Sequence, residues 1–515
     1  MTASIIKDYA QLAEVRDRCK IAGKNQKIGL CHGVFDVFHH GHLQYLKFAE
    51  RNCDILIVSI TSDENVNKGL GRPYFPDWKR AEILSELACV DAVFINNAIT
   101  AIPVISNLKP DLYIKGADYA LVDDDLTGNM ALEVNAVESY GGLVKFSDTS
   151  LSSSSFLLNR YFNVLSSEQN AYIDRQIPSG YLDSLRDTLD QARGLRCVVL
   201  GEPITDEFTD VEILGVAAKH NSVSVSVGET SKHFGGATAV AQHLANFGAS
   251  VIQIWPNRPK DSGIDKPVCD QATIHFSELQ LESDWEIPVK RRYENKRARL
   301  FETSNLDRYK AISDRDSDNL FVEISRLMGD ADLLVVADFG HGLISETLAA
   351  RLVDTFGERL VANVQANSGN FGFNLVSKYA GAKTLVCDER EARLCLRDLE
   401  EDRYALAEKL AACFGYREVW VTLGSDGSVG STSHDRNSER VSVCPSFCDR
   451  VIDTIGAGDA FFSCCAVLSS CNSLPLSGIS FASNIYAGMA ASIRGNERVP
   501  DIQTFLKSIK SMMIR

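Results

Sequence analysis

Two histidines near the amino terminus, His39 and His42, flank a glycine, Gly41. They follow a short apolar run, 27–31, and precede an amphipathic segment, 43–51, so we expect a strand, a turn and a helix in that order. A glycine lets a phosphate approach the backbone, and the N–H groups at a helix start attract anions. Imidazole donors at such a turn could stabilise the charge that develops when an α-phosphorus is attacked and pyrophosphate leaves. A purely structural role for clustered histidines fits the same short motif.

A second group of residues that could do chemistry lies at 453–459, in the order Asp-Thr-Ile-Gly-Ala-Gly-Asp. The N–H groups of Gly456, Ala457 and Gly458 could form an anion hole for a phosphoryl group in transfer. Asp459 could then accept the proton of an attacking sugar hydroxyl as a general base. The alternative is a glycine that ends one helix and an aspartate that caps the next.

The elements that must position these groups follow an alternating pattern. Short apolar runs typical of buried parallel strands occur at residues 27–31, 55–60, 92–95 and 111–114, and helix-length segments separate them. This alternation predicts an α/β fold with a parallel sheet and right-handed crossovers. A second unit begins with a buried-strand pattern at 195–201, and its alternating stretch 222–227 fits a small sheet over a cleft. We expect domains at 1–165 and 193–515, with a polar helical stretch at 166–192 as the linker between them.

Composition excludes several classes of protein. The 515 residues include 53 Lys and Arg against 68 Asp and Glu, a net charge of −15 that disfavours nucleic acid as the main partner. The 14 cysteines include no C-x-x-C pair, so neither a zinc site nor a disulfide framework is expected. No stretch has the length and apolarity of a signal peptide or a membrane span. We therefore expect a reduced, cytoplasmic protein without a membrane partner.

The complete string around the histidines, G-x-F-D-x-x-H-x-G-H over 33–42, resembles the nucleotidyltransferases that join CTP or ATP to a small phosphate or sugar 1-phosphate. Residues 71–73 (Gly-Arg-Pro) and 113–119 (Tyr-Ile-Lys-Gly-Ala-Asp-Tyr) look like further segments of the heptose 1-phosphate type. A serine run at 152–155 stands where that family closes a Ser-Thr-Thr run over the triphosphate. The resemblance implies a Rossmann-like domain in which His39, His42 and Lys115 are catalytic. It implies nucleotide and phosphate contacts by Gly33, Phe35, Asp36, Gly41, Arg72, Arg80, Ser152, Ser153 and Ser154.

The string D-T-x-G-A-G-D resembles the signature of ribokinase-like sugar kinases, and further matches extend over about 195–500. The resemblance implies an α/β domain with a small β-lid and Asp459 as the catalytic base. It implies nucleotide contacts by Thr422, Gly424, Gly427, Thr454, Gly456, Ala457, Gly458 and Asn484. It implies sugar contacts by Asp206, Gly235, Gly236 and Arg299. It also implies that Asp388 and Glu391 hold Mg²⁺ through water.

Three positions depart from the pattern of heptose kinases. Ala239 replaces an asparagine after the di-glycine turn, and an alanine cannot make the hydrogen bonds of an amide. His341 replaces a lysine, so a fixed cation becomes a titratable imidazole. Asp388 replaces the asparagine of an N-x-x-E element. Basic residues at 290–292 and 296–299 could bind a substrate phosphate or form a solvated charged strand.

Together the two resemblances point to the bifunctional heptose 7-phosphate kinase/heptose 1-phosphate adenylyltransferase family, with the order of the domains reversed. The leading hypothesis is an enzyme with Mg²⁺ that uses ATP to phosphorylate a sugar or sugar phosphate and ATP or CTP to make a sugar nucleotide. A second hypothesis keeps the transferase active, while the kinase-like unit serves sugar binding or dimerisation. A third hypothesis substitutes a polyol phosphate, with CTP, for the sugar. Small phosphorylated molecules are the expected partners, and analogy favours a homodimer.

Overall fold

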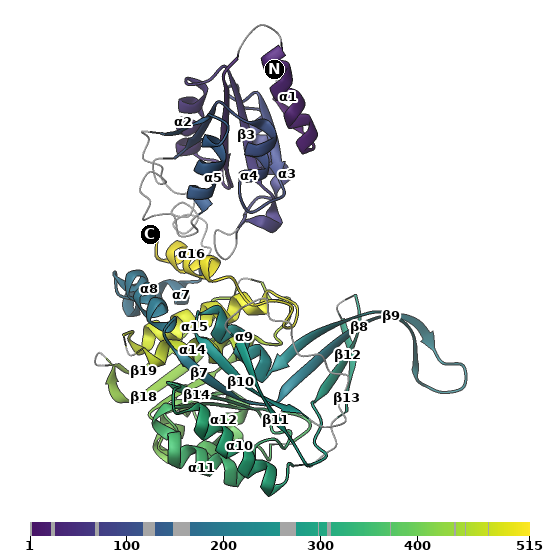
Figure 1. Ribbon diagram of the computed structural model, residues 1–515, viewed down its shortest axis with the longest axis vertical. Helices are drawn as coiled ribbons and strands as arrows, with labels where there is room; N and C mark the ends of the chain where they lie inside the picture. The colour runs from purple at the N-terminus through teal and green to yellow at the C-terminus, as the bar shows by residue number, and fades with distance from the viewer. Residues whose placement is uncertain are drawn as a thin grey trace. The chain divides into compact units, whose positions relative to one another are not determined.

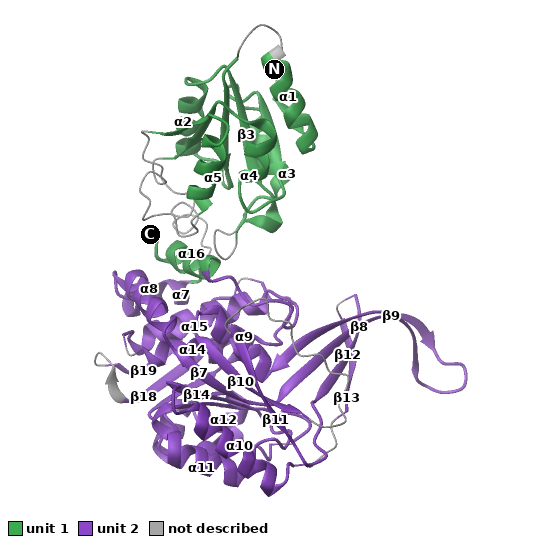
Figure 2. Cartoon of the chain, viewed as in Figure 1, with its two compact units in different colours: residues 1–166, 503–515 green, residues 167–502 purple. Residues whose placement is uncertain are grey.

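The computed structural model describes residues 3–21, 26–66, 72–116, 129–147, 165–257, 274–296, 298–305, 311–370, 372–436, 439–448, 450–471 and 473–514. The chain forms two compact units (Figure 2), one of residues 1–166 with 503–515 and one of residues 167–502. No helix in these described ranges is long and apolar enough to cross a membrane. The serines at 152–154 lie outside the described residues.

Unit 1 is built on a six-stranded parallel sheet with the order β1-β4-β3-β2-β5-β6. The strands are β1 (Ser4–Ile6), β2 (Ile28–Gly33), β3 (Ile55–Thr61), β4 (Ala92–Asn96), β5 (Leu112–Lys115) and β6 (Leu143–Phe146). Chain order runs from β2 to one side through β3 and β4, and to the other side through β5 and β6. Ligands of such sheets bind beyond the carboxyl ends of the strands at this reversal, here between β2 and β5.

Helices cover both faces of this sheet, because the strand residues that point to either face are apolar. Side chains of α2 (His40–Glu50) and α3 (Asp77–Ser85) share one apolar core with the sheet. Side chains of α1 (Tyr9–Ile21), α4 (Ile102–Leu108) and α5 (Asn129–Glu138) share the other. The four predicted strands are confirmed, and β1 and β6 are additional.

Unit 2 contains a nine-stranded sheet with the order β11-β10-β7-β14-β15-β16-β17-β18-β19. Its strands are β7 (Arg196–Gly201), β10 (Ser250–Asn257), β11 (Ile274–Gln280), β14 (Leu333–Asp338), β15 (Leu360–Val364), β16 (Thr384–Asp388), β17 (Glu418–Thr422), β18 (Ser428–Arg436) and β19 (Glu439–Cys444). Pairing is parallel up to β17, and β18 and β19 are antiparallel.

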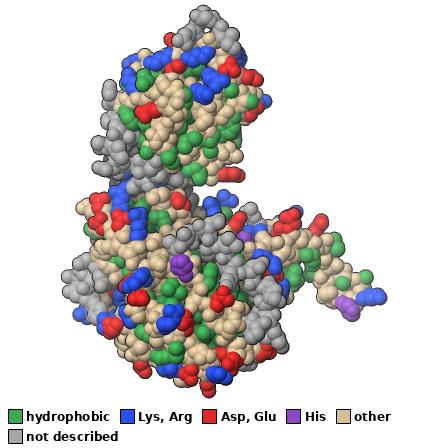
Figure 3. Space-filling view, viewed as in Figure 1, with side chains coloured by type: hydrophobic (Ala, Val, Ile, Leu, Met, Phe, Trp, Pro, Cys, Tyr) green, Lys and Arg blue, Asp and Glu red, His purple; other side chains and the backbone are tan. Residues whose placement is uncertain are grey.

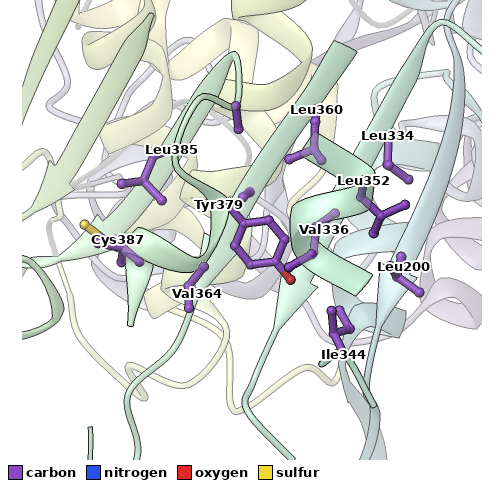
Figure 4. Packing of buried hydrophobic residues seen from close by; sticks show 14 of the residues in the cluster. Leu200, Leu334, Val336, Ile344, Leu352, Leu360, Val364, Tyr379, Leu385 and Cys387 are labelled. Atoms are coloured by element: carbon purple, nitrogen blue, oxygen red, sulfur yellow. The ribbon is translucent and has the colours of Figure 1, made fainter. Parts of the chain in front are cut away.

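Two helical layers enclose this sheet (Figure 1). One consists of α10 (Asp314–Leu327), α11 (Glu346–Phe356), α12 (Glu389–Leu396) and α13 (Leu406–Phe414), which bury the apolar cluster of Figure 4 against the strands. The other contains α9 (Ala237–Asn246), α14 (Ala457–Ser470) and α15 (Leu476–Ala491), which pack together. Such a double layer on a largely parallel sheet confirms the predicted α/β class.

A separate four-stranded sheet, ordered β13-β12-β8-β9, forms the lid that the alternating stretch predicted. The strands of this lid are β8 (Pro203–Val216), β9 (Val223–Gly236), β12 (Val289–Asn295) and β13 (Ala298–Ser304). The outer ends of β8 and β9, residues 211–227, extend as an arm beyond the other two strands (Figure 1).

Residues 167–192, where we expected a polar helical linker, form two helices, α7 (Ser167–Gln176) and α8 (Tyr181–Ala192), that belong to unit 2. The hydroxyl of Tyr172 donates to the carbonyl of Ser477 at 3.0 Å, and that of Tyr181 donates to Gly478 at 2.6 Å. These bonds, with the buried rings, anchor the segment on α15. The last helix, α16 (Ile502–Met513), is grouped almost entirely with unit 1 rather than with 193–502.

Candidate active sites

The histidine motif of unit 1 forms the start of α2, directly after the central strand β2. His39 is the N-cap residue, and its Nδ1 accepts the backbone N–H of Gly41 at 3.1 Å. An accepting Nδ1 places the proton of the neutral ring on Nε2, which makes Nε2 the donor. The ring of His42 stacks on that of His39, with centroids 3.9 Å apart and planes 26° apart. The structure thus brings both predicted histidines together at the sheet's reversal point.

The loop between β2 and α2 has an unusual backbone. Phe35 and Val37 have φ of 50° and 46°, a left-handed conformation that a β-branched valine rarely adopts. The Phe35 ring packs against His42, with centroids 5.4 Å apart, and against Tyr45 at 6.2 Å. Such outliers persist only where surrounding contacts fix them, and they concentrate at functional sites.

Asp36 fixes this loop from inside the protein. Its fully buried carboxylate accepts the backbone N–H groups of Tyr74 at 2.8 Å and Phe75 at 3.0 Å. It also accepts Nε of Arg72 at 2.6 Å. The carboxylate therefore ties residues 72–75 to the histidine loop and places the Arg72 guanidinium beside it. This geometry favours a positioning role for Asp36, and the direct contact with the nucleotide that the motif suggested stays a prediction.

Arg80 has a similar positioning geometry. Its Nε donates to the carbonyl of Phe75 at 2.9 Å, Nη1 to that of Val34 at 2.7 Å, and Nη2 to Asp63 at 2.6 Å. The side chain is 1% exposed. All three nitrogens of the guanidinium are thus used within the protein, and Arg80 joins three segments around the histidine loop. Its predicted phosphate contact stays a prediction that this geometry does not favour.

Lys115 is the last residue of β5, the strand beside β2. Its ammonium lies 3.0 Å from Oε2 of Glu133 on α5, and both side chains are largely buried. Gly33 at the end of β2 and Gly41 at the start of α2 complete the same edge of the sheet. Sequence reasoning did not find Glu133, because no motif residue marks it.

In unit 2, the predicted anion hole is the amino-terminal end of α14. Gly456 is its N-cap with φ of 80°, and a Cβ there would collide with Asn496. A Cβ on Gly458 would meet no described atom within 4 Å, so the space at the helix start is open. The carbonyl of Thr454 accepts the N–H of Ala457 at 3.3 Å, which closes the turn into the helix.

Asp459 lies in the first turn of α14 and is only 6% exposed. Burial, with the Asp206 carboxylate as the second cause, raises the pKa of Asp459 to about 7, and the Lys290 ammonium opposes the shift. Nε2 of Gln365 lies 3.4 Å from Oδ1 of Asp459 and donates to it. A carboxylate whose pKa lies near neutral pH is well matched to general-base catalysis. Neither Gln365 nor Lys290 belongs to a motif, so sequence reasoning did not find their contacts.

The predicted sugar residues meet at the base of the lid. Asp206 on β8 pairs with Nη1 of Arg292 on β12. A Cβ on Gly235 would collide with the Asp206 carboxylate, and Gly236 has φ of 61° at the N-cap of α9. Both glycines are therefore required by local geometry. Ala239 is buried within α9, so the missing asparagine leaves no polar group at that place.

Arg299 on β13 lies near two carboxylates, its side chain is 42% exposed, and its predicted sugar contact stays a prediction. Its Nη2 lies 3.7 Å from Oε1 of Glu294 and 3.6 Å from Oδ1 of Asp453. Asp453 also accepts the N–H groups of Ile455 and Gly495, both at 3.1 Å. Arg299 thus links the lid to the segment that leads into the anion hole.

His341, at the place of the family's lysine, carries no charge at neutral pH. Burial, and then the Lys290 ammonium, lowers the pKa of its ring to about 4. Its backbone N–H donates to Glu202 at 3.0 Å, while Nε2 is buried without a hydrogen-bond partner in the described chain. The cation beside Asp338 comes instead from Lys378, whose Nζ lies 2.7 Å from Oδ2 of Asp338.

Asp388 and Glu391 form a reciprocal capping box at the start of α12. The N–H of Glu391 donates to Asp388 at 2.7 Å, and the N–H of Asp388 donates back to Oε2 of Glu391 at 2.8 Å. Oε1 of Glu391 accepts the N–H of Ala366 at 2.9 Å. Burial raises the pKa of Glu391 to about 8 and also raises that of Asp388.

The remaining nucleotide residues follow β17. Thr422 ends that strand, and Gly424 and Gly427 turn the chain with φ of 62° and 98°. Nδ2 of Asn484 on α15 donates to Oγ of Ser428 at 2.8 Å, directly after this turn. The structure therefore brings Asn484 beside the glycine turn, as the resemblance implied.

Two family descriptions match separate parts of the chain. The cytidylyltransferase-like family matches residues 30–157, and the pfkB family of carbohydrate kinases matches residues 302–469. The bifunctional protein HldE of Paramagnetospirillum magneticum is 42% identical over 134 residues, 26% of this chain and 26% of that protein. HldE of Geobacter metallireducens is 37% identical over 142 residues, 27% of each chain. The chain thus spans about a quarter of these relatives' length, in its amino-terminal region.

Among solved structures, phosphofructokinase-2 from Escherichia coli aligns with 62% of this chain and 98% of its own, with a TM-score of 0.47 and 13% identity. Ribokinase from Thermotoga maritima aligns with 61% and 99%, with a TM-score of 0.44 and 15% identity. The family matches confirm the two predicted domains and their order. The chain joins an amino-terminal cytidylyltransferase-like domain to a carboxyl-terminal domain of the pfkB family of carbohydrate kinases.

Proposed function

We propose that the chain is a bifunctional enzyme that phosphorylates a sugar or sugar phosphate from ATP and transfers a nucleotidyl group to a sugar 1-phosphate. The observation that carries the proposal is Asp459, a carboxyl with a pKa near 7 directly behind an open glycine-rich helix start. The paired histidines at the start of α2 support the second activity. The relatives named HldE are described as bifunctional, in agreement with two active domains.

In the kinase reaction, Asp459 removes the proton of a sugar hydroxyl as the hydroxyl oxygen attacks the γ-phosphorus of ATP. The bond between the γ-phosphorus and the bridging oxygen breaks, and ADP leaves. The N–H groups of Gly456 and Gly458 face the charge on the transferring group, whereas that of Ala457 already donates to the carbonyl of Thr454. Asp206 and the di-glycine turn hold the sugar under the lid. Thr422, Gly424, Gly427 and Asn484 form the proposed nucleotide side.

In the transferase reaction, an oxygen of the sugar 1-phosphate attacks the α-phosphorus of ATP or CTP, and pyrophosphate leaves. His39 donates from Nε2, and His42, stacked on it, adds a second imidazole at the same helix start. The helix N-terminus and the Lys115 ammonium complement the anionic phosphates. Asp36 and Arg80 hold the histidine loop in this geometry through their hydrogen bonds to the neighbouring backbone.

Mg²⁺ fits the carboxylates at the start of α12. Oxygen ligands suit this ion, and one or two carboxylates with substrate phosphates are its usual partners. Both Glu391 oxygens already accept backbone N–H groups, so contact through water fits better than direct ligation. When bound, Mg²⁺ would offset the charge of the ATP phosphates. Among the described residues, no group of three or more His, Cys, Asp or Glu forms a tighter metal site.

The cleft under the lid favours a substrate that carries its own phosphate. Arg291 pairs with Glu207 at 2.8 Å and Arg292 pairs with Asp206, whereas Lys290 makes no ion pair within the described chain. The Lys290 ammonium acts on both Asp459 and His341, so it lies near the proposed reacting centre. Lys290 is therefore the proposed phosphate-binding cation of this cleft, in place of Arg299.

We also propose that two copies pair through the arm. The arm carries several hydrophobic side chains on its surface (Figure 3), and exposed apolar patches are typical of interaction sites. The exposed residues are Ile213, Leu214, Val216, Val223 and Val227. Sedimentation of the intact protein should give a dimer, and Leu214→Asp with Val223→Asp should give a monomer.

The test offers one preparation a panel of sugar and polyol phosphates with ATP and CTP together, and products are identified by mass spectrometry. ADP formation that Asp459→Asn abolishes supports the kinase, and pyrophosphate release that His42→Ala abolishes supports the transferase. Transfer without any ADP formation would leave the kinase-like unit as a sugar-binding or dimerisation module. If the only product forms from CTP and a polyol phosphate, the substrate of the proposal is a polyol phosphate and not a sugar phosphate.

A further inference from the structure

A cavity opens on the surface of unit 2 beside the helix α12. Its volume is about 710 Å³, within the range of about 300–1,000 Å³ that small-molecule sites occupy. Four residues of α12 and its C-cap line one side, namely Arg390, Arg393, Leu394 and Arg397. They lie on one face of the helix, because residues three, four and seven positions apart are neighbours there. The described lining of the cavity contains none of the residues that we assign to the two active sites.

The loop that follows α12 lines the other side of the cavity, and hydrogen bonds fix its conformation. Nη1 of Arg393 donates to the carbonyl of Leu399 at 3.1 Å and to that of Glu401 at 3.0 Å. Oδ1 of Asp398 accepts the backbone N–H groups of Glu400 at 3.0 Å and Glu401 at 3.1 Å. The helix and the loop are therefore joined before any ligand binds. A preformed site of this kind loses less conformational freedom on binding.

Two carboxylates also line the cavity, and other cations already neutralise both of them. Oε1 of Glu389 accepts Nε of Arg393 at 3.0 Å and Nη2 of the same guanidinium at 2.8 Å. Oε2 of Glu389 pairs with Arg403. Oδ2 of Asp398 accepts Nζ of Lys409 at 2.9 Å. Neither carboxylate is therefore left to balance a further positive charge in the cavity.

Arg390 and Arg397 supply such a further charge. Both residues are exposed, and within the described ranges neither guanidinium makes a hydrogen bond or an ion pair. Leu394 lies between them on the helix, and Leu399 of the loop is 84% exposed. A ligand that covers these leucines removes apolar surface from water, which favours binding. The cavity thus combines two uncompensated cations with an exposed apolar surface.

We propose that this cavity binds a phosphate monoester whose phosphate is attached to an apolar ring or chain. A monoester phosphate carries a charge between about −1.5 and −2 at pH 7, which matches the two guanidinium groups. A guanidinium also presents a planar set of donors that fits phosphate oxygens. Leu394 and Leu399 cover the apolar part of the ligand. This site is additional to the proposed kinase and transferase reactions and does not depend on them.

The experiment measures the binding of 1-naphthyl phosphate to the full-length protein by isothermal titration calorimetry. The wild type should bind this probe, and Arg390→Gln with Arg397→Gln should raise Kd about tenfold or more, because hydrogen bonds between charged groups are lost. Arg440→Gln removes an exposed arginine from β19 of the same unit and should leave Kd unchanged. Comparing the proteins removes any binding of the probe at the active sites, which all of them retain. No binding to the wild type, or an unchanged Kd in the double variant, would overturn the proposal.

Related probes test the two parts of the ligand separately. Inorganic phosphate has the anion without the ring, and 1-naphthylmethanol has the ring without the anion. Each should bind the wild type about tenfold more weakly than 1-naphthyl phosphate, or weaker still. 1-Naphthoate carries one negative charge and should also bind more weakly. Inorganic phosphate that binds as tightly as the full probe would contradict the apolar part of the site, and equally tight binding of 1-naphthoate would contradict the phosphate.

Single variants keep the test decisive if the double variant is unstable. Leu399→Asn should raise Kd for 1-naphthyl phosphate and leave that for inorganic phosphate unchanged, since it removes only apolar contact. Arg397→Gln should raise Kd for both phosphates, since it removes a cation. Thermal midpoints, measured on the same samples, report whether each variant folds. Folded single variants that both bind 1-naphthyl phosphate as the wild type does would show that the probe binds elsewhere.

Discussion

The imidazole rings of His39 and His42 stack 3.9 Å apart, one at the N-cap of α2 and the other in its first turn. His39 has two functions in this arrangement, since its Nδ1 caps Gly41 while its Nε2 is left as the donor. The cap fixes the orientation of the proposed donor, so in the proposed mechanism structure and catalysis depend on opposite sides of one ring. Substitutions that keep one side and remove the other can separate them.

Replacing His39 by asparagine and by alanine makes this separation. Asparagine is a good N-cap and keeps an acceptor for Gly41, whereas alanine loses the cap and about 1 kcal/mol of stability. Both variants lose the Nε2 donor and should lose about 10²- to 10³-fold in nucleotidyl transfer. Pyrophosphate release and chemical unfolding measure the two effects, with kinase activity as the internal control. If His39→Asn keeps full transferase activity, Nε2 is not the donor.

The two glycines of the kinase anion hole should respond differently to alanine. Gly456→Ala places a Cβ against Asn496 at a positive φ, so it should destabilise unit 2 and abolish phosphorylation. Gly458→Ala meets nothing in the described chain, so stability should be kept or slightly raised by the better helix former. The new methyl group would, however, occupy the space proposed for the phosphoryl group.

We therefore expect Gly458→Ala to lose kinase activity at an unchanged thermal midpoint. ADP formation and thermal unfolding, measured side by side with the wild type, test this. Full activity in Gly458→Ala would place the phosphoryl group elsewhere.

The sequence predicts the fold well, because parallel strands buried on both faces are continuous apolar runs. The runs at 55–60 and 111–114 agree closely with β3 and β5. The histidine motif follows a strand, and both motifs lead into a helix. The sequence around each motif therefore also indicates where in the fold it lies. Asp459 and His39 are at helix starts in the structure, as their flanking small residues indicate.

The hydrogen-bond partners of Asp36 and Arg80 could not be predicted in this way. The residue type at a motif position does not show whether the side chain contacts a ligand or holds the loop through bonds within the protein. That distinction depends on Tyr74, Phe75 and Asp63, which come close only in the folded chain. Glu133 and Gln365 were missed for the same reason.

The sequence indicated a helical stretch at 167–192, but its polar composition concealed that these helices pack on unit 2. Tyr181, Leu185, Leu189 and Ala192 recur at a helical spacing, and all four are buried in α8. Such a stripe is typical of a helix that packs on a core. Its polar residues form the solvated face rather than a linker.

The ionisation of Asp459, the proposed kinase base, should also make the stability of the protein depend on pH. Burial and Asp206 raise the pKa of Asp459 to about 7, whereas an unfolded aspartate ionises near pH ~4. Between these values the native state binds a proton that the unfolded state has lost, so this group makes stability fall as pH rises. Asp459→Asn removes the effect, so its midpoint relative to the wild type should increase from pH 5 to pH 8.

The same variant should lose about 10²- to 10⁴-fold in phosphorylation above pH 7, where the wild-type base is ionised, and the loss should become smaller at lower pH. Thermal midpoints at several pH values, always taken as differences from the wild type, remove the contributions of Glu202 and Glu391. A midpoint difference that is constant between pH 5 and pH 8 would show that Asp459 is ionised throughout.

Arg80→Lys tests whether this arginine anchors the loop or binds phosphate. A lysine cannot reproduce three bonds that diverge to Phe75, Val34 and Asp63, and each buried acceptor left unpaired costs about 1–3 kcal/mol. We expect unit 1 to unfold at lower urea concentration and transferase activity to fall, while kinase activity is kept. Arg51→Lys, an exposed site at the end of α2, is the matched control and should change neither. An unchanged unfolding midpoint with a raised KM for the nucleotide would instead make Arg80 a direct phosphate ligand.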